Sequence, residues 1–319
     1  MNHGLLVQLI VSGMLYGTPL IIAALGELLT ERSGVLNLGV EGIMLIGAVC
    51  GFWISQRVGG SSTVALTFAI VGAAGAGGLM SLIHAFVTIT LRGNQIVSGL
   101  ALTIFGGAVG LSSYFGQIGN LSGHAGHNAF QPINVLGLKN LPLVGPVLFD
   151  QNLLVYGSWL LAIAIALYLY RTRLGLRVRA VGEEPKAADA MGINVPRYRY
   201  IHTILGGCCA GVGGAVYSLA ISPNWTDGMT AGAGWIAIGL VIVAFWRPGL
   251  VVAGGYLFGI VTSLGFTLRA RGVNLPPELY SALPYLLIIV VLVAVSKVWA
   301  TGRFGAPKAL GAAYERNEA

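Results

Sequence analysis

The stretch Arg179–Ile193, RAVGEEPKAADAMGI, is a polar interruption in a chain that is otherwise close to continuous hydrocarbon. Pro185 suits the first position of a helix, where its missing N–H costs nothing, and Glu183 and Glu184 suit the positive end of the helix dipole. Gly192 is a natural left-handed cap at the other end. The stretch therefore predicts a helix of about two turns, which is too short to be stable alone in water and needs a surface to pack on.

The composition of the whole chain points to a membrane protein. Of its 319 residues, 55% are hydrophobic and 9% are charged, whereas soluble domains usually carry about 25% charged residues. The 48 glycines fit transmembrane helices, in which small residues let helix backbones approach closely. Cys50, Cys208 and Cys209 lie in apolar stretches without the spacing of metal ligands, so we expect buried thiols and no metal site there.

Hydropathy predicts nine membrane spans, because a span needs roughly 20 mainly apolar residues. The range is eight to ten, since the third segment is long and interrupted by glycines and the seventh is short. We expect an all-α, polytopic helix bundle built as a single domain over 1–319, with polar loops at 118–151 and 171–199. The nine segments are 5–29, 35–56, 63–91, 95–117, 152–170, 200–222, 232–246, 249–268 and 279–298.

Lysine and arginine predict the orientation of the spans, because they are in excess in cytoplasmic loops. If 171–199 is cytoplasmic and the spans alternate, Arg57, Lys139, Arg269 and Arg271 lie outside, and the other fourteen of the 18 basic residues lie inside. The C-terminus is then cytoplasmic, and nine spans put the N-terminus outside. The net charge of +7 is thus a signal of topology and needs no nucleic acid to explain it.

The outer loop 118–151 is rich in Gly, Pro and Asn and contains His124 and His127. Two histidines three residues apart could bind a metal, but no third ligand is evident nearby. We expect a solvated loop that caps the outer face or meets a partner there.

The chain lacks a phosphate-binding loop of the form G-x-x-x-x-G-K-[ST], which a transporter that uses ATP itself would need. TGRFGAPK, at 301–308, has the wrong spacing. The energy must therefore come from a partner subunit or from an ion gradient. Ion-coupled carriers keep ionisable residues within the membrane, where this chain offers Glu27, Glu41 and His84.

The polar residues Asn37 and Glu41 are four apart and would face the same way in a helix. They either line the solute pathway or form a buried polar pair that locks helix packing, and the sequence leaves both open. Glu27 and Glu31 are expected to pair with Arg32 at the inner surface.

Further polar and aromatic residues are candidates either for the solute pathway or for structural roles such as helix capping, hydrogen bonding between helices and anchoring at the membrane interface. Asn94, Gln95 and Ser98 are expected to cap the fourth span, and Gln95 and Ser98 are also candidates for the inner vestibule. His84 is expected to make an interhelical hydrogen bond. Trp225 and Trp235 suit anchoring at the membrane interface, with stacking on a base in transit as the alternative for Trp235.

The segment 175–199, GLRVRAVGEEPKAADAMGINVPRYR, resembles the cytoplasmic coupling loop of permeases of ATP-binding-cassette (ABC) importers. The resemblance implies a coupling helix that inserts into a cleft of an ATP-hydrolysing subunit. The matching positions are Gly182, Glu183, Glu184, Pro185, Lys186, Ala187, Ala188, Asp189 and Gly192.

Three further blocks are similar to the branched-chain amino acid, ribose and nucleoside branch of these permeases. Glu31–Ala48, ERSGVLNLGVEGIMLIGA, looks like the signature of nucleoside-type importers that work with a binding lipoprotein, and Arg92–Gly106 is similar to the second, shorter permease of their pair. Thr230–Pro248 matches a third block, although Ala233 stands where the family often has a basic residue.

The resemblance implies a permease subunit for nucleosides or, less so, a simple sugar. Such a subunit has no catalytic residues and no cofactor of its own, because ATP and Mg²⁺ bind its ATPase. The implied partners are a second similar permease, the cytoplasmic ATPase, an extracytoplasmic solute-binding protein or lipoprotein, and the lipid of the bacterial cytoplasmic (inner) membrane. The alternative is an ion-coupled secondary carrier of a small polar solute.

Overall fold

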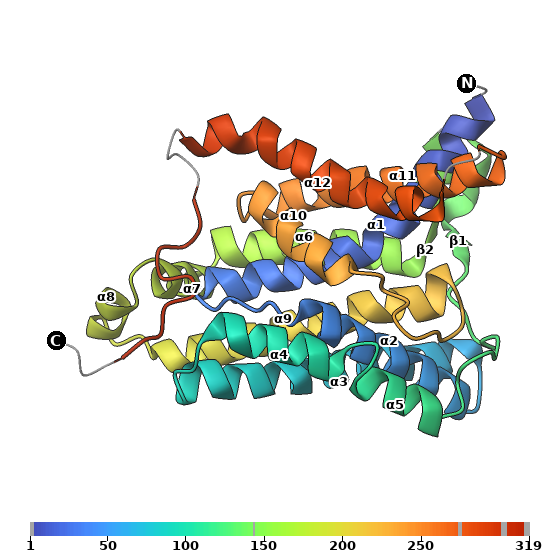
Figure 1. Ribbon diagram of the computed structural model, residues 1–319. Helices are drawn as coiled ribbons and strands as arrows, with labels where there is room; N and C mark the ends of the chain where they lie inside the picture. The colour runs from blue at the N-terminus through green and yellow to red at the C-terminus, as the bar shows by residue number, and fades with distance from the viewer. Residues whose placement is uncertain (1–2, 143, 274–275, 301–304, 316–319) are drawn as a thin grey trace.

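The computed structural model describes residues 3–142, 144–273, 276–300 and 305–315, and nearly all of them are helical or in short connections. Its long helices run side by side along one direction as a single bundle (Figure 1). This confirms the expected all-α bundle. The N-terminal half comprises α1 (His3–Arg32), α2 (Val40–Arg57), α3 (Ser62–Ala85), the π-helix η1 (Phe86–Thr90), α4 (Gln95–Gly106) and α5 (Leu111–Ile118).

The second half begins with an outer loop of short elements and continues with the remaining helices. The loop holds β1 (Pro132–Asn134), η2 (Val135–Asn140), η3 (Gly145–Phe149) and β2 (Asp150–Asn152). After it come α6 (Leu153–Arg171), α7 (Arg173–Glu183), α8 (Pro185–Ala190), α9 (Val195–Val216), the π-helix η4 (Tyr217–Ile221), α10 (Ala233–Val243), α11 (Pro248–Ala270) and α12 (Pro277–Ala300).

Each of the nine predicted spans coincides with a helix or a pair of consecutive helices. Within the described ranges, seven helical segments are long and apolar enough to cross a membrane. The other two predicted spans correspond to α2, with 18 residues, and to α10, with 11. The count of nine therefore depends on these two shorter helices.

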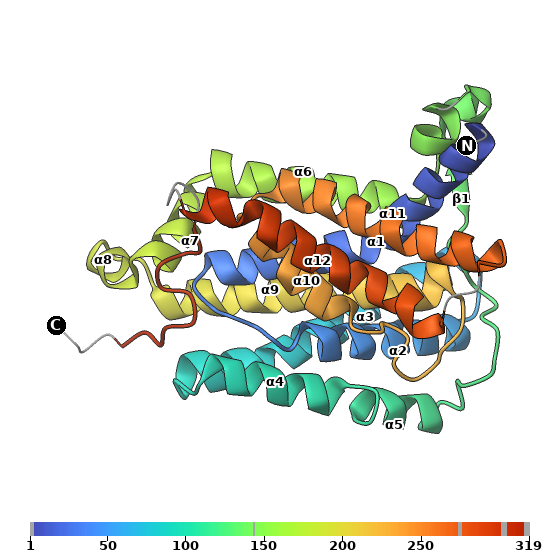
Figure 2. The same ribbon diagram turned by 45° about the horizontal axis from the view of Figure 1, so that its top comes forward.

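Both short helices follow a stretch of irregular chain inside the bundle. We call residues 33–39 the polar link: the chain leaves the end of α1 and runs without helix toward the middle of the bundle before α2 begins (Figure 2). Residues 222–232 likewise enter from the other end before α10 begins at Ala233. Such interruptions are typical of transporters, where they line or border the solute site.

Small residues let α2, α3 and α9 pack closely at the centre. A Cβ added at Gly47 of α2 would overlap the backbone of Gly211 in α9, and one at Gly211 would overlap the carbonyl of Ala73 in α3. The helix α12 contrasts with this core, since only 6% of its most apolar window is buried. Its exposed face is therefore available to lipid or to another membrane subunit.

The outer loop and the His3 end of α1 lie at the end of the bundle opposite α8 (Figure 1). The antiparallel pair β1–β2 closes this loop, and Ala125 bridges to Asn224, which joins the loop to the chain before α10. Among the described residues no three His, Cys, Asp or Glu side chains come together to hold a metal, so His124 and His127 have no third ligand there.

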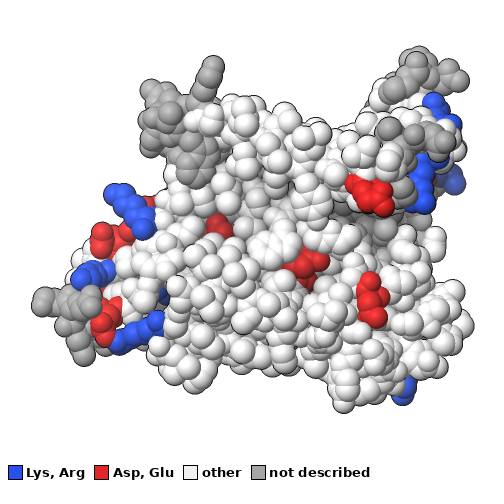
Figure 3. Space-filling view, viewed as in Figure 1, with Lys and Arg blue, Asp and Glu red and all other residues white. Residues whose placement is uncertain are grey.

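Basic side chains gather at the two ends of the molecule, with almost no blue between them on the face in Figure 3. Apart from a few acidic patches, the surface between the ends is uncharged on this face, and a bilayer requires most of the protein surface within it to be uncharged.

Candidate functional site

The polar link is held by side chains from the helices around it. Non-helical backbone at membrane depth is tolerated only when its N–H and C=O groups are bound within the protein. Leu36 N–H donates to Gln95 Oε1 over 2.7 Å, and Leu36 O lies 3.1 Å from His84 Nε2. Thr103 Oγ1 donates to Leu38 O over 2.8 Å. Two helices, α3 and α4, thus supply the partners that the missing helical turns would have supplied.

Three more side chains complete this support. Asn37 N–H donates to Glu27 Oε1 over 3.1 Å, and Asn37 Oδ1 accepts from Gly39 N–H over 2.9 Å. Ser98 Oγ lies 3.0 Å from His84 Nδ1. The interhelical bond expected of His84 is therefore present. Asn94 caps α4 as expected, through Val97 N–H at 3.1 Å.

Asn37 and Glu41 do not share a helix face, so the prediction from their spacing is wrong. The helix α2 begins only at Val40, after Asn37 has bonded to the backbone of Gly39. Asn side chains compete with helix formation through such local bonds. Asn37 thus stabilises the polar link, while Glu41 lies in the first turn of α2 and points elsewhere.

Glu41 joins the beginnings of the two short helices. The residue is 8% exposed, and its carboxylate accepts three hydrogen bonds: from Thr230 Oγ1 at 2.6 Å, Gly232 N–H at 2.9 Å and Gly234 N–H at 2.6 Å. These donors belong to the chain entering α10 and to its first turn, where unpaired N–H groups and the helix dipole favour a negative charge. We call this arrangement the Glu41 junction.

The expected pairing of Glu27 and Glu31 with Arg32 takes a different form. Glu27 binds the polar link, as described above. Trp246 Nε1 donates to Glu31, and Arg32 Nη2 donates to Trp246 O over 3.1 Å. Glu31 and Arg32 therefore meet at Trp246 and fasten the end of α10 to the end of α1.

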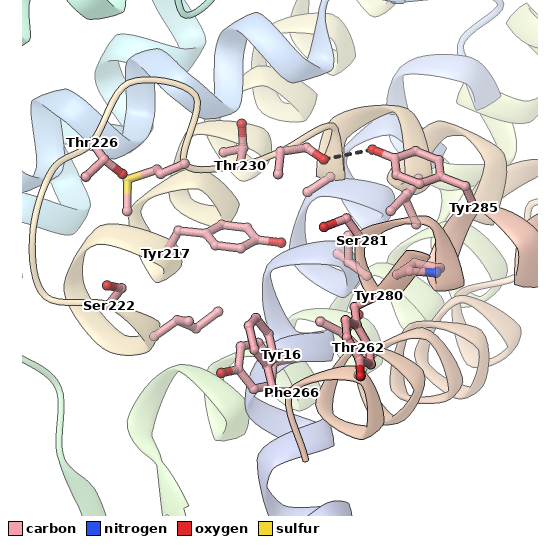
Figure 4. A pocket seen from close by; sticks show the side chains of 18 of the residues that line it. Tyr16, Tyr217, Ser222, Thr226, Thr230, Thr262, Phe266, Tyr280, Ser281 and Tyr285 are labelled. Carbon is pink, nitrogen blue, oxygen red and sulfur yellow. Dashed lines mark hydrogen bonds between the residues drawn. The ribbon is translucent and has the colours of Figure 1, made fainter. Parts of the chain in front are cut away.

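A cavity of about 440 Å³ opens beside the Glu41 junction (Figure 4). It lies between α1, η4, the chain 222–232, α11 and α12. Thr230 lines the cavity and also binds Glu41, so the cavity and the junction adjoin. Five aromatic rings contribute to its wall: those of Tyr16, Tyr217, Phe266, Tyr280 and Tyr285.

The aromatic rings and hydroxyls of the cavity are held in place to different degrees. Tyr16 and Phe266 stack with ring centroids 5.1 Å apart, and Tyr285 donates to Ala231 O over 2.7 Å. Tyr217 stands on the π-helix η4 and directs its hydroxyl into the cavity (Figure 4). Single π-helical turns of this kind recur at functional sites. Hydroxyls of Ser222, Thr226 and Thr262 add further polar groups to the lining.

The two tryptophans near this site have different environments. Trp235 is 37% exposed on α10, as an interfacial or partner-facing ring would be, and is not among the residues that line the cavity. Trp225 is fully buried, so the prediction of an interfacial anchor is wrong for it. It packs against Gly116 of α5, because the outer loop folds over the chain before α10.

The opening stretch of the sequence forms α7 and the short helix α8 at one end of the bundle. The helix α8 begins at Pro185, because Glu184, which precedes the proline, has a non-helical backbone with φ −147° and ψ 83°. Ala188 is 4% exposed and packs with Val181 and Val195. The helix thus has a surface within its own chain to pack on, and it turns its other face outward.

The ends of α8 are defined as its sequence predicts. Pro185 occupies the first turn, and Gly192 has a φ of +79°. Gly192 N–H donates to Asp189 O over 2.8 Å, and Ile193 N–H donates to Ala188 O over 3.0 Å. Met191, at the outward end, is 82% exposed. Gly182 is buried in α7, whereas Glu184, Lys186, Ala187 and Ala190 are exposed.

The sequence alone did not identify Thr103, Tyr217 or Thr230 as part of these sites. Threonines in apolar helices are common, and nothing local distinguishes Thr103 from its neighbours. The glycine-rich run TAGAG at 230–234 was a usable signal, because closely spaced glycines expose backbone N–H groups to a nearby anion.

Comparison with known families gives a match over residues 9–292 to the family described as "Branched-chain amino acid transport system / permease component". The chain is also 39% identical to the "Putative glucose ABC transporter permease protein TsgC13" of Haloferax volcanii over 320 residues, which cover 94% of each chain.

Two further relatives carry the names of nucleoside permeases. The "Nucleoside ABC transporter permease protein NupC" of Lactococcus lactis is 37% identical, with 98% of each chain covered. The "Guanosine ABC transporter permease protein NupQ" of Bacillus subtilis is 35% identical, with 94% of each chain covered. All three similarities extend over nearly the whole bundle.

Proposed function

This chain belongs to the branched-chain amino acid transport system permease family and is a non-catalytic membrane permease of the ABC class; we propose that its solute is a nucleoside. A simple sugar is the second candidate, because a relative at 39% identity is named for glucose. The cavity beside the Glu41 junction carries the proposal. It combines stacked aromatic rings with hydroxyl groups, and a nucleoside offers a planar base and a ribose.

Each part of a nucleoside has a suitable partner in the cavity wall. Aromatic side chains stack on any base, since every base has a π-face. The hydroxyls of Tyr217, Thr226 and Thr262 can exchange hydrogen bonds with ribose or with base edges. In this proposal the solute passes through the cavity, and the Glu41 junction forms part of the adjoining wall.

The proposed orientation places the α8 end in the cytoplasm of a bacterial cell, with the protein in its inner membrane. Arg171, Arg173, Arg177 and Arg179 gather at that end, in and next to α7, in keeping with the excess of positive charge in cytoplasmic loops. Residues 305–315 lie at the same end (Figure 1), so the proposal also has a cytoplasmic C-terminal segment.

The proposed partners follow from this orientation. The exposed face of α8 docks in a groove of a cytoplasmic ATPase, which binds ATP and Mg²⁺. The face that includes α12 is proposed to meet a second permease, because so little of that helix is buried. An extracytoplasmic binding protein delivers the solute to the end that carries the outer loop. The docking residues proposed on α8 and beside it are Glu183, Glu184, Pro185, Lys186, Ala187, Asp189 and Gly192, whereas the buried Gly182 and Ala188 are proposed to hold α8 in position.

The function is tested by uptake of radiolabelled guanosine and glucose into cells that express this chain with its neighbouring ATPase, second permease and binding protein. We expect ATP-dependent uptake of guanosine that unlabelled nucleosides compete away. Uptake of glucose alone would favour the second candidate. Transport by the isolated chain on a proton or Na⁺ gradient would contradict the ABC mechanism and support an ion-coupled carrier.

The place of the solute is tested by Tyr217→Leu, with Tyr114→Leu as its control. Tyr114 is 56% exposed on α5 and does not line the cavity. We expect the first variant to raise the guanosine concentration needed for half-maximal uptake and the second to leave it unchanged. If the two variants need the same guanosine concentration for half-maximal uptake, the cavity is not part of the solute pathway.

A further inference from the structure

Residues 305–315, which we call the strap, cross the α8 end of the bundle as irregular chain (Figure 1). The strap is bound to the base of α8. Ala309 is 8% exposed, and its N–H donates to Gly182 O over 2.9 Å. Gly182 lies in the last turn of α7, three residues before α8 begins. A shift of α8 would therefore act directly on the strap.

The strap is also bound to α9 through a buried arginine. Arg199 is 2% exposed, and its Nη1 donates to Ala312 O over 2.9 Å. Its Nε and Nη2 make no hydrogen bond within the described residues. Since a buried cation without acceptors is costly, the carbonyl of Ala312 is important to the position of this side chain.

Gln95 connects the strap to the polar link. Its Nε2 lies 3.5 Å from Ala312 O, and its Oε1 accepts from Leu36 N–H over 2.7 Å. Arg92, which precedes α4, forms an ion pair with Glu315 of the strap. Contacts thus continue from α8 through Gly182, the strap and Gln95 to the chain that leads into the Glu41 junction.

We propose that the strap transmits movement of α8 to the polar link, with Arg199 and Gln95 as the positioning residues that hold it. The proposal rests on the function above, in which α8 docks on an ATPase. Docking moves α8 and α7, Gly182 pulls on the strap, and Gln95 conveys the shift to Leu36. Packed elements with two discrete arrangements turn such small displacements into a switch between states.

The experiment uses the whole complex with its ATPase in liposomes and measures solute moved per ATP hydrolysed. Ala309→Pro removes the N–H that binds Gly182. Lys308→Pro is the matched control. Leu310 N–H donates to Pro307 O and so closes a turn over 307–310. Residue 308 is the second position of this turn, where proline is favoured. We expect Ala309→Pro to lower the ratio about 2- to 30-fold and the control to keep it.

Arg199 provides the second measurement, which applies even if Ala309→Pro fails to assemble. We expect Arg199→Gln to co-purify with the ATPase and lower the ratio, and Arg199→Lys to restore much of it by keeping a charged donor. If Arg199→Gln moves as much solute per ATP as the wild type, the strap does not transmit the movement of α8. The same result in an assembled Ala309→Pro complex would also contradict the proposal. Failure of the wild-type chain to co-purify with any ATPase would instead contradict the proposed function.

Discussion

The carboxylate of Glu41 lies 2.6 Å from the backbone N–H of Gly234, so the first turn of α2 is hydrogen-bonded to the first turn of α10. These residues are 193 positions apart in the sequence. A Cβ at Gly234 would collide with the backbone of Glu41, so the two helix ends also touch directly. The hydrogen bond and the close backbone contact thus fix the start of α2 against the start of α10, next to the cavity.

Replacing Glu41 by glutamine should destabilise this junction. The amide keeps one acceptor oxygen but turns an NH₂ group toward a backbone N–H, so at least one charge-assisted bond is lost, at a cost of about 1.5–3 kcal/mol. We expect a lower thermal unfolding midpoint of the purified protein and a reduced rate of solute uptake. Asp227→Asn is the control, because Asp227 is an exposed acid of the same connection. Equal effects of the two changes would show that the junction contributes nothing specific.

Replacing Gly192 by valine should impair docking of α8 through the backbone alone. The position has a φ of +79° and open space around it, so the cost is conformational strain of about 1–2 kcal/mol rather than collision. We expect less ATPase to co-purify and slower uptake. Gly60→Val is the control, since Gly60 has a φ of +103° and equally open space but lies between α2 and α3, at the end opposite α8. A normal yield of ATPase with Gly192→Val would count against α8 as the docking helix.

Replacing Gly47 by alanine should separate α2 from α9. The added methyl group would overlap the backbone of Gly211, and overpacking of this kind costs about 1–3 kcal/mol. Gly75→Ala, in α3, meets nothing within 4 Å and should be neutral or stabilise the helix by up to about 1 kcal/mol. The comparison is made by thermal unfolding in the same detergent. Two equal melting curves would mean that α2 and α9 are less closely packed than described.

Replacing His84 by leucine should loosen the polar link. The side chain is fully buried, and its loss leaves Leu36 O without the partner that now lies 3.1 Å away. An unsatisfied buried acceptor costs about 1–3 kcal/mol. We expect faster hydrogen exchange of the link and slower uptake. His127→Leu, on the exposed outer loop, should change neither, and unchanged exchange in the His84 variant would refute the supporting role.

The sequence by itself determined the membrane class, the nine apolar segments, the ends of α8 and the cap at Gly192. These features follow from interactions along the chain. Hydropathy over about 20 residues predicts a span. A proline at the start and a glycine past the end mark a short helix, because each affects only the backbone next to it.

The tertiary structure alone decided what the polar residues within the membrane do. Asn37 and Glu41 looked like one helical face, yet Asn37 bonds to its own link and Glu41 bonds to α10. Gln95 looked like a cap and instead joins the polar link to the strap. Partners that lie far apart in the sequence meet only after the helices pack. A buried polar group must find a partner wherever the fold provides one, and local pattern does not indicate where that is.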